Sequence, residues 1–432
     1  MFRGGALPSM DDEKMPLTSQ RSFLFLQGPP SGFWHRLADG LEDSGARISK
    51  VNLCAADWLF WRRPGALNYR GSLEDWRSWL TQHIEDTGVT DVIYYADQLP
   101  YHMVAREVAE EAGARAWAME FGYLRPDWLT IEPGGMGREI GWLKDPEILR
   151  GFARGSARPD MSIRYTHGFV EEAVGEVSFN LAMVLGWPFF PRYRSDKFQH
   201  PIFDYLCWIP ELLREPLQQR AARQVERSCR AAACPYHLLA MQLQSDYQVR
   251  SYTPYTHLEE MIDEVLASFA QHAAPGHRLV IKVHPLDNGA QSWPRRVRRI
   301  AKSLDVEDRV FLIKGGDLGH MLDHADGVVL ANSTVGLHAL RRGVPVKVMG
   351  RAVYDIEGLT HQGPLSDFWE TPEVVDPELA EGLIRAMAAK IQVKGSFYDR
   401  EGQSAAIRSL VSILLGEAQE APAQPQLALA GA

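Results

Sequence analysis

Two carboxylates occupy places where catalytic side chains are often found, directly after an apolar run of strand length. Asp246 follows residues 237–244, and Glu120 follows residues 114–119. A carboxylate at the end of a strand can act as a nucleophile, as a base or as an electrostatic partner for an oxocarbenium-like centre. We predict that both are catalytic. A structural carboxylate paired with a nearby arginine is the simpler alternative for each.

Polar side chains lie close to both carboxylates in the sequence. We expect five of them to bind substrate: Gln242, Gln244, Arg250, Tyr123 and Arg125. The amides and the guanidinium around Asp246 would keep its carboxylate ionised. Glu120 and Arg125 could hold an acceptor hydroxyl or an acidic substrate.

A histidine and a lysine end another apolar run. Lys282, His284 and Pro285 lie at the end of residues 279–283. Proline ends a strand and fixes the turn, which would direct the imidazole into a cleft. There the imidazole could donate a hydrogen bond to a phosphate or protonate a leaving oxygen. We therefore predict that His284 is catalytic and that it binds a nucleotide together with Lys282 and Pro285; a turn histidine satisfied by the backbone is the alternative.

A second segment of this kind is Asn332, Ser333 and Thr334, which follows residues 327–330 and precedes a helical pattern. Hydroxyls and free N–H groups at the start of a helix can bind an anion, and a simple N-cap is the alternative. The histidine segment and this one occupy consecutive strand-to-helix crossings. We predict that they bind one nucleotide phosphate together.

Apolar runs of strand length alternate with helical patterns in two stretches of the chain. The expected strands are residues 22–27, 48–53, 91–95 and 114–119 in the first stretch, and 237–244, 279–283, 310–313, 327–330 and 344–348 in the second. Such alternation predicts parallel sheets that are covered on both faces. The predicted fold class is α/β, with two Rossmann-like domains facing a cleft. This architecture suits GT-B glycosyltransferases, sugar-nucleotide epimerases and periplasmic binding proteins.

The same patterns predict domain boundaries. We expect disordered ends at 1–20 and 417–432, an N-terminal Rossmann-like domain at 21–190, a connecting segment at 191–234 and a C-terminal Rossmann-like domain at 235–416. The first domain would bind the acceptor and the second the nucleotide. The Pro- and aromatic-rich middle, about 125–234, is expected to be irregular.

Composition and missing motifs exclude several functions. With 46 basic and 55 acidic residues the net charge is −9, so a nucleic-acid partner is not expected. The chain has no GxGxxG after a strand, no P-loop, no D-x-D pair and no HExxH, and we expect no metal. Its four cysteines form no CxxC pair, and no run of about 18 apolar residues is present. These features predict reduced thiols in a cytoplasmic protein that is soluble or peripheral to a membrane.

Five long segments together resemble the capsule-polysaccharide biosynthesis proteins of the KpsS type. They are FLQGPPSGFWHRLADGL, EFGYLRPDW, QLQSDYQVR, KVHPLDNG and ANSTVGLHALRRGVPVKVMGRAVYDIEGLTHQGPL. The resemblance spans roughly residues 22–415 in consistent order. Members of this family, with their KpsC relatives, are retaining β-Kdo glycosyltransferases that use CMP-Kdo. They build a short Kdo linker on a lyso-phosphatidylglycerol lipid, and the capsule is later attached to that linker.

The resemblance implies roles for particular residues. His284 and Pro285 would contact the CMP phosphate, with Ser333 and Thr334 completing that site. Asp246 would be the nucleophile of a double displacement. The more usual family member has two acidic residues before GYLRP, where this chain keeps only Glu120. Kdo carries a carboxylate, for which Lys282, Arg125 and Arg250 are the candidate cations. CMP is a monophosphate leaving group, so no metal or other cofactor is implied.

Two rival functions remain open at this point. One is a non-catalytic capsule assembly or export partner that keeps a GT-B shell, and the other is a UDP-sugar 2-epimerase. A KpsC-like transferase and a capsule export complex are expected partners of the favoured enzyme.

We further expect docking on the anionic inner face of the cytoplasmic membrane through local basic patches. Three patches are visible: residues 187–197, with four aromatic or proline residues before Arg192, Arg194 and Lys197; residues 295–302; and the arginines between 220 and 230.

Overall fold

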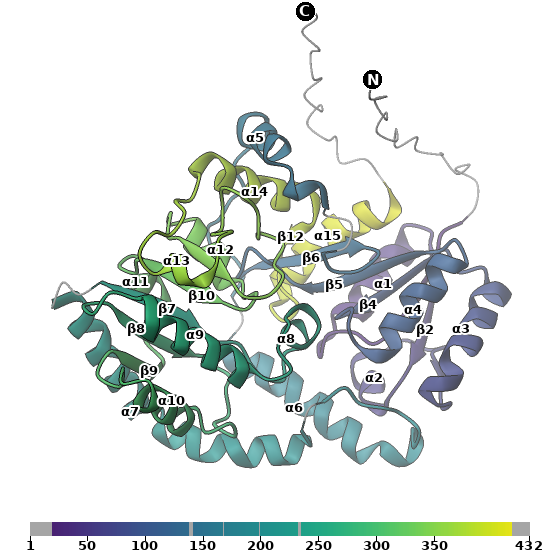
Figure 1. Cartoon of the computed structure of the whole chain (residues 1–432). Coiled ribbons are helices and arrows are strands. Elements are labelled where there is room, and N and C mark those ends of the chain that lie inside the picture. The colour runs from purple at the N-terminus through teal and green to yellow at the C-terminus, as the bar shows by residue number, and fades with distance from the viewer. Residues whose placement is uncertain (1–19, 138–140, 167, 198, 232–234, 417–432) are drawn as a thin grey trace, which may run out of the picture.

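The computed structural model describes residues 20–137, 141–166, 168–197, 199–231 and 235–416. The disordered ends predicted at 1–20 and 417–432 therefore lie, apart from Gln20, outside the described residues. Two sheets flanked by helices make up the described chain (Figure 1). This confirms the predicted α/β class with two Rossmann-like units.

The first sheet has seven strands in the order β12-β6-β5-β4-β1-β2-β3. Their bounds are β1 Ser22–Phe25, β2 Arg47–Asn52, β3 Leu67–Asn68, β4 Asp91–Tyr95, β5 Arg115–Phe121, β6 Trp128–Pro133 and β12 Gln392–Lys394. β1 to β5 are parallel to one another, whereas β6 pairs antiparallel with both β5 and β12. The carboxyl ends of β1, β4 and β5 therefore share one edge of the sheet.

The second sheet has five parallel strands in the order β11-β10-β7-β8-β9. The strands are β7 Tyr236–Ala240, β8 Arg278–Val283, β9 Val310–Lys314, β10 Gly327–Leu330 and β11 Val346–Val348. β7 is central, with β10 and β8 on either side. The loops after these three strands, which carry the predicted site residues, are therefore neighbours.

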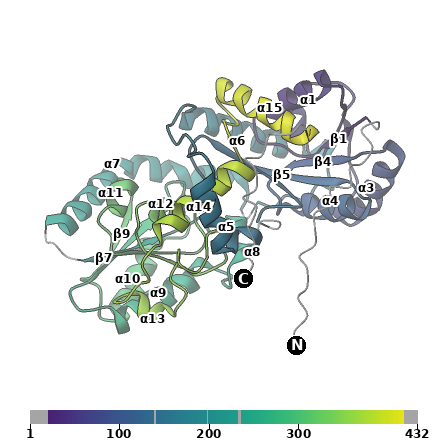
Figure 2. The ribbon, with the colours of Figure 1, turned by 90° about the horizontal axis from the view of Figure 1, so that it is seen from above.

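Alternate residues of each central strand enter different cores, because side chains point to opposite faces of a sheet. Phe23 and Phe25 of β1 pack with α1 (Phe33–Asp43) and α15 (Arg400–Leu415), whereas Leu24 packs with α3 (Leu73–Thr87) and α4 (Pro100–Glu111). Figure 2 shows the two helix layers on opposite sides of the first sheet. All four residues of β1 and all five of β7 are buried, as expected for parallel strands covered on both faces.

Helices surround the second sheet in the same way. They are α8 Tyr247–Tyr252, α9 Leu258–His272, α10 Trp293–Ser303, α11 Leu318–Leu322, α12 Val335–Leu340, α13 Leu365–Phe368 and α14 Pro377–Lys390. Leu239 faces α9 and α13 in one core, whereas Leu238 lies in the other core with residues of α12 and α14.

The chain returns to the first sheet at its C-terminal end. The domain prediction placed residues up to 416 in the second unit, whereas β12 pairs with β6 and α15 packs on α1. Val393 and Phe397 are buried in the core of the first unit. An apolar pattern can locate such a strand but cannot name its partner, because the pairing is long-range.

The middle of the chain is largely helical, which corrects the expected irregular join. In chain order it contains η1 Gly141–Lys144, α5 Pro146–Gly155, α6 Phe169–Leu185, η2 Trp187–Phe189 and α7 Pro201–Ala231. α6 packs against α2 (Ala55–Phe60) of the first unit. α7 continues through Pro210 and Pro216. Both prolines, and Leu206 and Leu212 four residues before them, are exposed. Water can therefore bond the carbonyls that lose an N–H partner, which makes these prolines tolerable.

Candidate functional site

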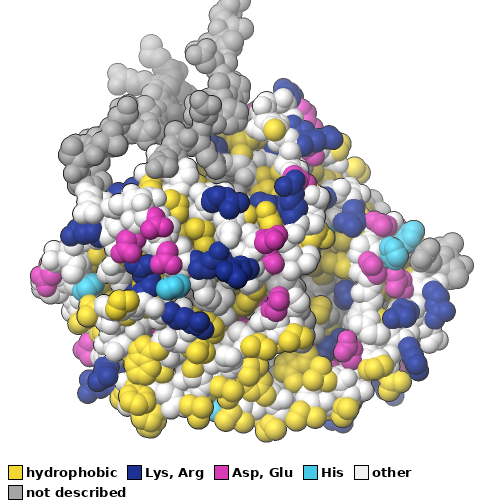
Figure 3. All heavy atoms as spheres, turned by 180° about the vertical axis from the view of Figure 1, so that it is seen from behind, with side chains coloured by type: hydrophobic (Ala, Val, Ile, Leu, Met, Phe, Trp, Pro, Cys, Tyr) yellow, Lys and Arg dark blue, Asp and Glu magenta, His cyan; other side chains and the backbone are white. Residues whose placement is uncertain are grey.

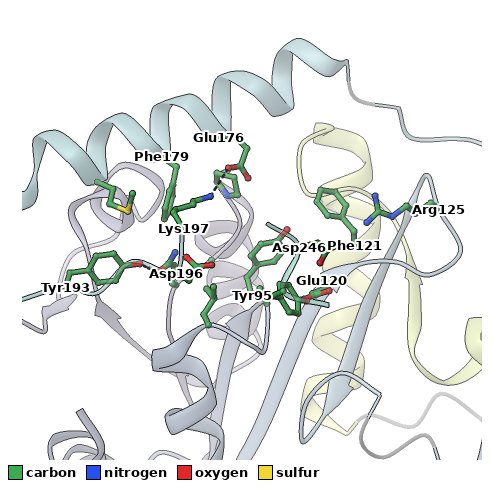
Figure 4. Close-up of a pocket in the computed structure, with 17 residues that line it drawn as sticks. Tyr95, Glu120, Phe121, Arg125, Glu176, Phe179, Tyr193, Asp196, Lys197 and Asp246 are labelled. Carbon is green, nitrogen blue, oxygen red and sulfur yellow. Dashed lines mark hydrogen bonds and ion pairs between the residues drawn. The ribbon is translucent and has the colours of Figure 1, made fainter. Parts of the chain in front are cut away.

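A cavity of about 290 Å³ opens at the carboxyl edge of the first sheet (Figure 4). Loops after β1, β4 and β5, one face of α6, the segment before α7 and the turn before α8 enclose it. The lining residues are Gln27, Gly28, Pro30, Tyr95, Ala96, Leu99, Glu120, Phe121, Arg125, Glu176, Phe179, Met183, Tyr193, Asp196, Lys197, Asp246 and Tyr247. The structure thus brings Glu120 and Arg125 of the first unit together with Asp246 of the second.

Two glycines allow the walls of this cavity to close. A Cβ on Gly28 would lie 2.4 Å from the ring of Trp34, whose Nε1 donates to the Leu26 carbonyl. A Cβ on Gly175 would lie 2.4 Å from the carbonyl oxygen of Pro30. The turn after β1 therefore packs directly against both α1 and α6, and α6 becomes a wall of the cavity.

Glu120 is held in a setting that disfavours its charge. Its Oε1 is buried and has no hydrogen-bond partner among the described residues. Burial, followed by the charges of Asp97 and Asp246, raises the pKa of Glu120 well above its ordinary value. A carboxyl with a raised pKa can accept and release a proton near neutral pH, as general acid–base catalysis requires.

Asp97 is a second buried carboxylate that the sequence analysis missed. Its Oδ2 accepts hydrogen bonds from the Met136 N–H (3.0 Å) and from Gln98 (3.1 Å), and burial raises its pKa. Gln98 also donates to the Tyr252 hydroxyl of α8 at 3.0 Å, which links the two units beside the cavity. The signal was present, because Asp97 follows an expected strand just as Glu120 does.

His284 lies outside the cavity, at the carboxyl end of β8. Its Nδ1 accepts a hydrogen bond from the Leu286 N–H at 3.1 Å. Burial, followed by the charge of Arg125, lowers the pKa of His284 to about 4. The ring is therefore neutral at pH 7 with its proton on Nε2, which can donate to a phosphate.

Arg125 lines the cavity at the edge of the first sheet, and its charge acts on histidines at the edge of the second sheet. Its guanidinium lies over the Phe121 ring, 5.1 Å from the centroid. It also contributes to the pKa of His338 on α12, which burial, Arg341 and Arg342 lower more strongly, to about 4. His338 is a further neutral imidazole near this edge that the sequence analysis did not select.

The segment after β10 is fixed by the segment after β7. Gln242 Nε2 donates to Asn332 Oδ1 at 2.9 Å, and the Asn332 N–H donates to Gln242 Oε1 at 3.0 Å. Ser333 Oγ accepts from the Val335 N–H at 3.2 Å, and Thr334 is the N-cap of α12 without a side-chain capping bond. Gln242 therefore positions the predicted phosphate-binding segment, and both polar atoms of its side-chain amide bond Asn332.

Two predicted binding residues serve other parts of the fold. The Lys282 ammonium donates to the carbonyl of Gly315, and burial lowers its pKa. Gln244 Oε1 accepts from the Leu258 N–H at 2.8 Å, and its Nε2 donates to the Thr256 carbonyl at 3.4 Å. Lys282 thus secures the turn after β9 and Gln244 the start of α9, rather than facing the cavity.

The remaining predicted residues are placed at the margins. Tyr123 hydrogen bonds to Glu132 of β6, Arg250 is exposed on α8, and Pro285 is exposed beside His284. Arg250 therefore lies away from the lining of the cavity, and its predicted role in binding substrate stays a prediction. In its place Lys197, from the segment before α7, supplies a cation to the cavity and lies 4.0 Å from Glu176.

The described ranges contain neither a metal-type cluster of side chains nor a helix suited to crossing a membrane. In residues 20–416 outside the gaps given above, no three His, Cys, Asp or Glu side chains gather as a metal site would require. Over the same ranges no helix has the length and apolar character to cross a membrane.

Comparison with known proteins identifies the family. Residues 90–398, more than half of the chain, match the family described as capsule polysaccharide biosynthesis protein. The chain belongs to this family. The family membership expected from the five sequence segments is thereby confirmed.

Individual relatives of this capsule-biosynthesis family member extend the match. It is 30% identical over 387 residues to the Escherichia coli capsule polysaccharide export protein KpsS, covering 88% of this chain and 98% of the relative. It is 29% identical over 393 residues to the Neisseria meningitidis serogroup A capsule polysaccharide modification protein LipB, covering 89% and 93%. Among solved structures it is similar to KpsC of Thermosulfurimonas dismutans, a β-Kdo 2,7 transferase, with 15% identity, a TM-score of 0.43, and coverage of 90% and 99%.

The raised pKa of Glu120 predicts that this side chain lowers stability above acidic pH. A carboxyl whose folded-state pKa is raised favours the fold below its unfolded pKa and loses that contribution as pH rises through the folded pKa. Glu120→Gln removes the titration, so we expect the variant to melt roughly 2–4 °C above the parent at pH 8 and not at pH 5. Thermal melting at both pH values, with the exposed Glu370→Gln as control, measures this. An equal shift at both pH values would contradict it.

Proposed function

We propose that this protein is a retaining β-Kdo glycosyltransferase that transfers Kdo from CMP-Kdo to a lyso-phosphatidylglycerol acceptor. The product would start the poly-Kdo linker of a capsule. The observation that carries the proposal is that Glu120 and Asp246, from different units of the chain, line one cavity. Family membership supports the capsule context, and the resemblance described above implies the donor and the acceptor.

The cavity lining holds two cations beside four acids, Glu120, Glu176, Asp196 and Asp246, and the cations are the groups that would bind this donor. Kdo carries a carboxylate beside its anomeric carbon, and Arg125 and Lys197 are the cations in the lining. The neutral His284, with its proton on Nε2, would donate to the CMP phosphate, and Ser333 and Thr334 would add their hydroxyls. Arg125 lines the cavity, and its charge also lowers the pKa of His284. This favours a donor whose carboxylate lies in the cavity while its phosphate lies at His284.

The two carboxylates would divide the chemistry between them. Asp246 attacks the anomeric carbon, and the bond to CMP breaks with its electron pair leaving on the phosphate. This forms a covalent Kdo ester on Asp246. Glu120 then takes the proton of the acceptor hydroxyl, whose oxygen displaces Asp246. Two inversions give net retention, as in other double displacements.

The acceptor side of the cavity is partly apolar. Phe179 and Met183 of α6 line it together with Tyr95 and Phe121. A lipid-linked acceptor would place its head-group hydroxyl near Glu120. The proposal includes a cytoplasmic protein that is peripheral on the inner face of the cytoplasmic membrane, where such an acceptor would be located. A KpsC-like transferase to extend the linker and a capsule export complex to receive the product are the proposed partners.

The function is tested by incubating the purified protein with CMP-Kdo and lyso-phosphatidylglycerol. We expect stoichiometric release of CMP and a lipid product heavier by one Kdo in the mass spectrum. A non-catalytic export partner would bind without releasing CMP. A UDP-sugar 2-epimerase would leave CMP-Kdo intact and interconvert UDP-sugars, so either outcome would replace the proposal.

Asp246→Asn tests the nucleophile. The substitution is nearly isosteric, so the fold should persist, while we expect kcat to fall by several orders of magnitude. The intact mass of Glu120→Gln after mixing with CMP-Kdo should show the added Kdo, because the second step is slowed, and peptide mapping should place the adduct on Asp246. Near-normal turnover of Asp246→Asn would remove this residue from the role.

His284→Ala tests the phosphate contact. Losing one hydrogen bond to a charged group should weaken CMP binding by about 1.5–3 kcal/mol. Calorimetric titration of CMP measures this, with His320→Ala on exposed α11 as the matched control. Unchanged affinity in His284→Ala would place the nucleotide elsewhere.

A further inference from the structure

A concentrated row of exposed apolar side chains runs along α6, η2 and α7. Within the described residues, 13 of the 21 exposed large apolar side chains fall between positions 170 and 217. We call these 13 the apolar ridge: Val170, Val174, Leu181, Leu185, Trp187, Phe189, Ile202, Phe203, Leu206, Ile209, Leu212, Leu213 and Leu217. Such clustering marks an interaction surface, whereas single exposed apolar residues do not.

The ridge follows from the same spacing on both helices. On α6, Val174, Leu181 and Leu185 follow Val170 by 4, 11 and 15 residues, and on α7 Leu206, Leu213 and Leu217 follow Ile202 by the same intervals. At 3.6 residues per turn these intervals keep all four side chains of each helix on one face. The ridge therefore consists of one apolar face on each helix, with Trp187 and Phe189 between the two helices in the chain.

The pictures place the ridge on one side of the molecule. α6 and α7 run one after the other along the lower edge in Figure 1, and Figure 3, seen from behind, shows apolar side chains collected along that edge. Trp58 at the end of α2 contacts Phe189, with ring centroids 5.5 Å apart, and continues the ridge beyond η2.

The opposite face of α6 lines the cavity. Glu176, Phe179 and Met183 point into it, about half a helical turn away from the ridge residues. One helix thus separates the exposed apolar surface from the candidate active site.

The fully exposed charged side chains around the ridge are mainly cations. The exposed charged side chains between positions 170 and 223 comprise six cations and two acids, although the net charge is −9. The cations are Arg192, Arg194, Lys197, Arg214, Arg220 and Arg223, and the acids are Glu171 and Glu215. Of the other acids in this range, Glu211 is buried and paired with Lys314 at 2.7 Å, whereas Glu172, Glu176, Asp196 and Asp204 are half-buried.

We propose that the apolar ridge is the surface by which this protein lies on an anionic phospholipid bilayer, with its apolar side chains among the acyl chains. Apolar helix faces, a tryptophan between them and flanking cations are the features of helices that lie in a membrane interface. A lipid would then enter the cavity beside α6 without leaving the bilayer; this last step rests on the proposed function, whereas the docking does not.

The test is co-sedimentation with phosphatidylcholine vesicles containing 0 or about 30% phosphatidylglycerol. We expect the wild-type protein to bind the anionic vesicles, and high salt to weaken but not abolish binding, since apolar insertion is not screened. A ridge variant, Leu185→Glu with Leu213→Glu, should bind at least tenfold less. These side chains are 75% and 78% exposed, so folding should be unaffected, and thermal melting checks this.

The matched control is Ile163→Glu with Val374→Glu, which changes two apolar side chains outside the ridge that are 60% and 83% exposed. It should bind vesicles like the wild type. Equal vesicle binding by the ridge variant and this control would overturn the proposal. So would a ridge variant that changes only the oligomeric state in light scattering, because the ridge would then be a protein interface.

A soluble acceptor separates this proposal from the proposed function. With a short-chain lyso-lipid below its micelle concentration, the ridge variant should release CMP at the wild-type rate, and with the acceptor in vesicles it should be at least tenfold slower. If no variant releases CMP in either format, the transferase proposal fails, and the vesicle-binding comparison still decides the docking surface.

Discussion

The candidate site depends on the return of the chain to the first sheet as β12. Gln392 Nε2 donates to Thr130 Oγ1 at 2.6 Å, and its Oε1 accepts from the Leu124 N–H at 3.4 Å, in the loop that carries Glu120 and Arg125. Lys394 adds a 2.8 Å ion pair with the buried Asp127. Because β12 follows the entire second unit, closing the first sheet also limits where the second unit can lie. That limit is what allows Asp246 to face Glu120.

The site contains buried polar groups whose placement lowers the stability of the fold. Glu120 Oε1 and Asp97 Oδ1 are buried without hydrogen-bond partners among the described residues, and burial raises the pKa of both carboxyls. By contrast, the buried Lys50 has partners for its charge, because its ammonium donates to the Leu26 carbonyl at 3.1 Å and lies 3.4 Å from Asp57. Local conflict of this kind is concentrated at functional sites. These two carboxyl oxygens without partners are therefore better explained by chemistry than by packing.

Sequence reasoning succeeded where the local pattern carries the information. Buried parallel strands read as apolar runs, so the strands and the loops after them were predicted, and Glu120, Asp246 and His284 were found at their ends. It failed where position depends on distant contacts: nothing local shows that Lys282 bonds Gly315, or that β12 pairs with β6. The helices α6 and α7 escaped notice because their apolar faces are exposed and α7 contains two prolines. Phe179 of α6 and Lys197, just before α7, line the cavity and were therefore not predicted as site residues.

The proposed mechanism needs one reaction centre built from both units, and comparing single and double variants shows whether Glu120 and Asp246 form it. Turnover of CMP-Kdo would be measured for Glu120→Gln, Asp246→Asn and the double variant under identical conditions. Residues that serve one reaction are strongly non-additive. We expect the double variant to turn over CMP-Kdo at a rate within about threefold of the slower single variant. A double variant slowed by the product of the two single losses would show two independent sites and contradict it.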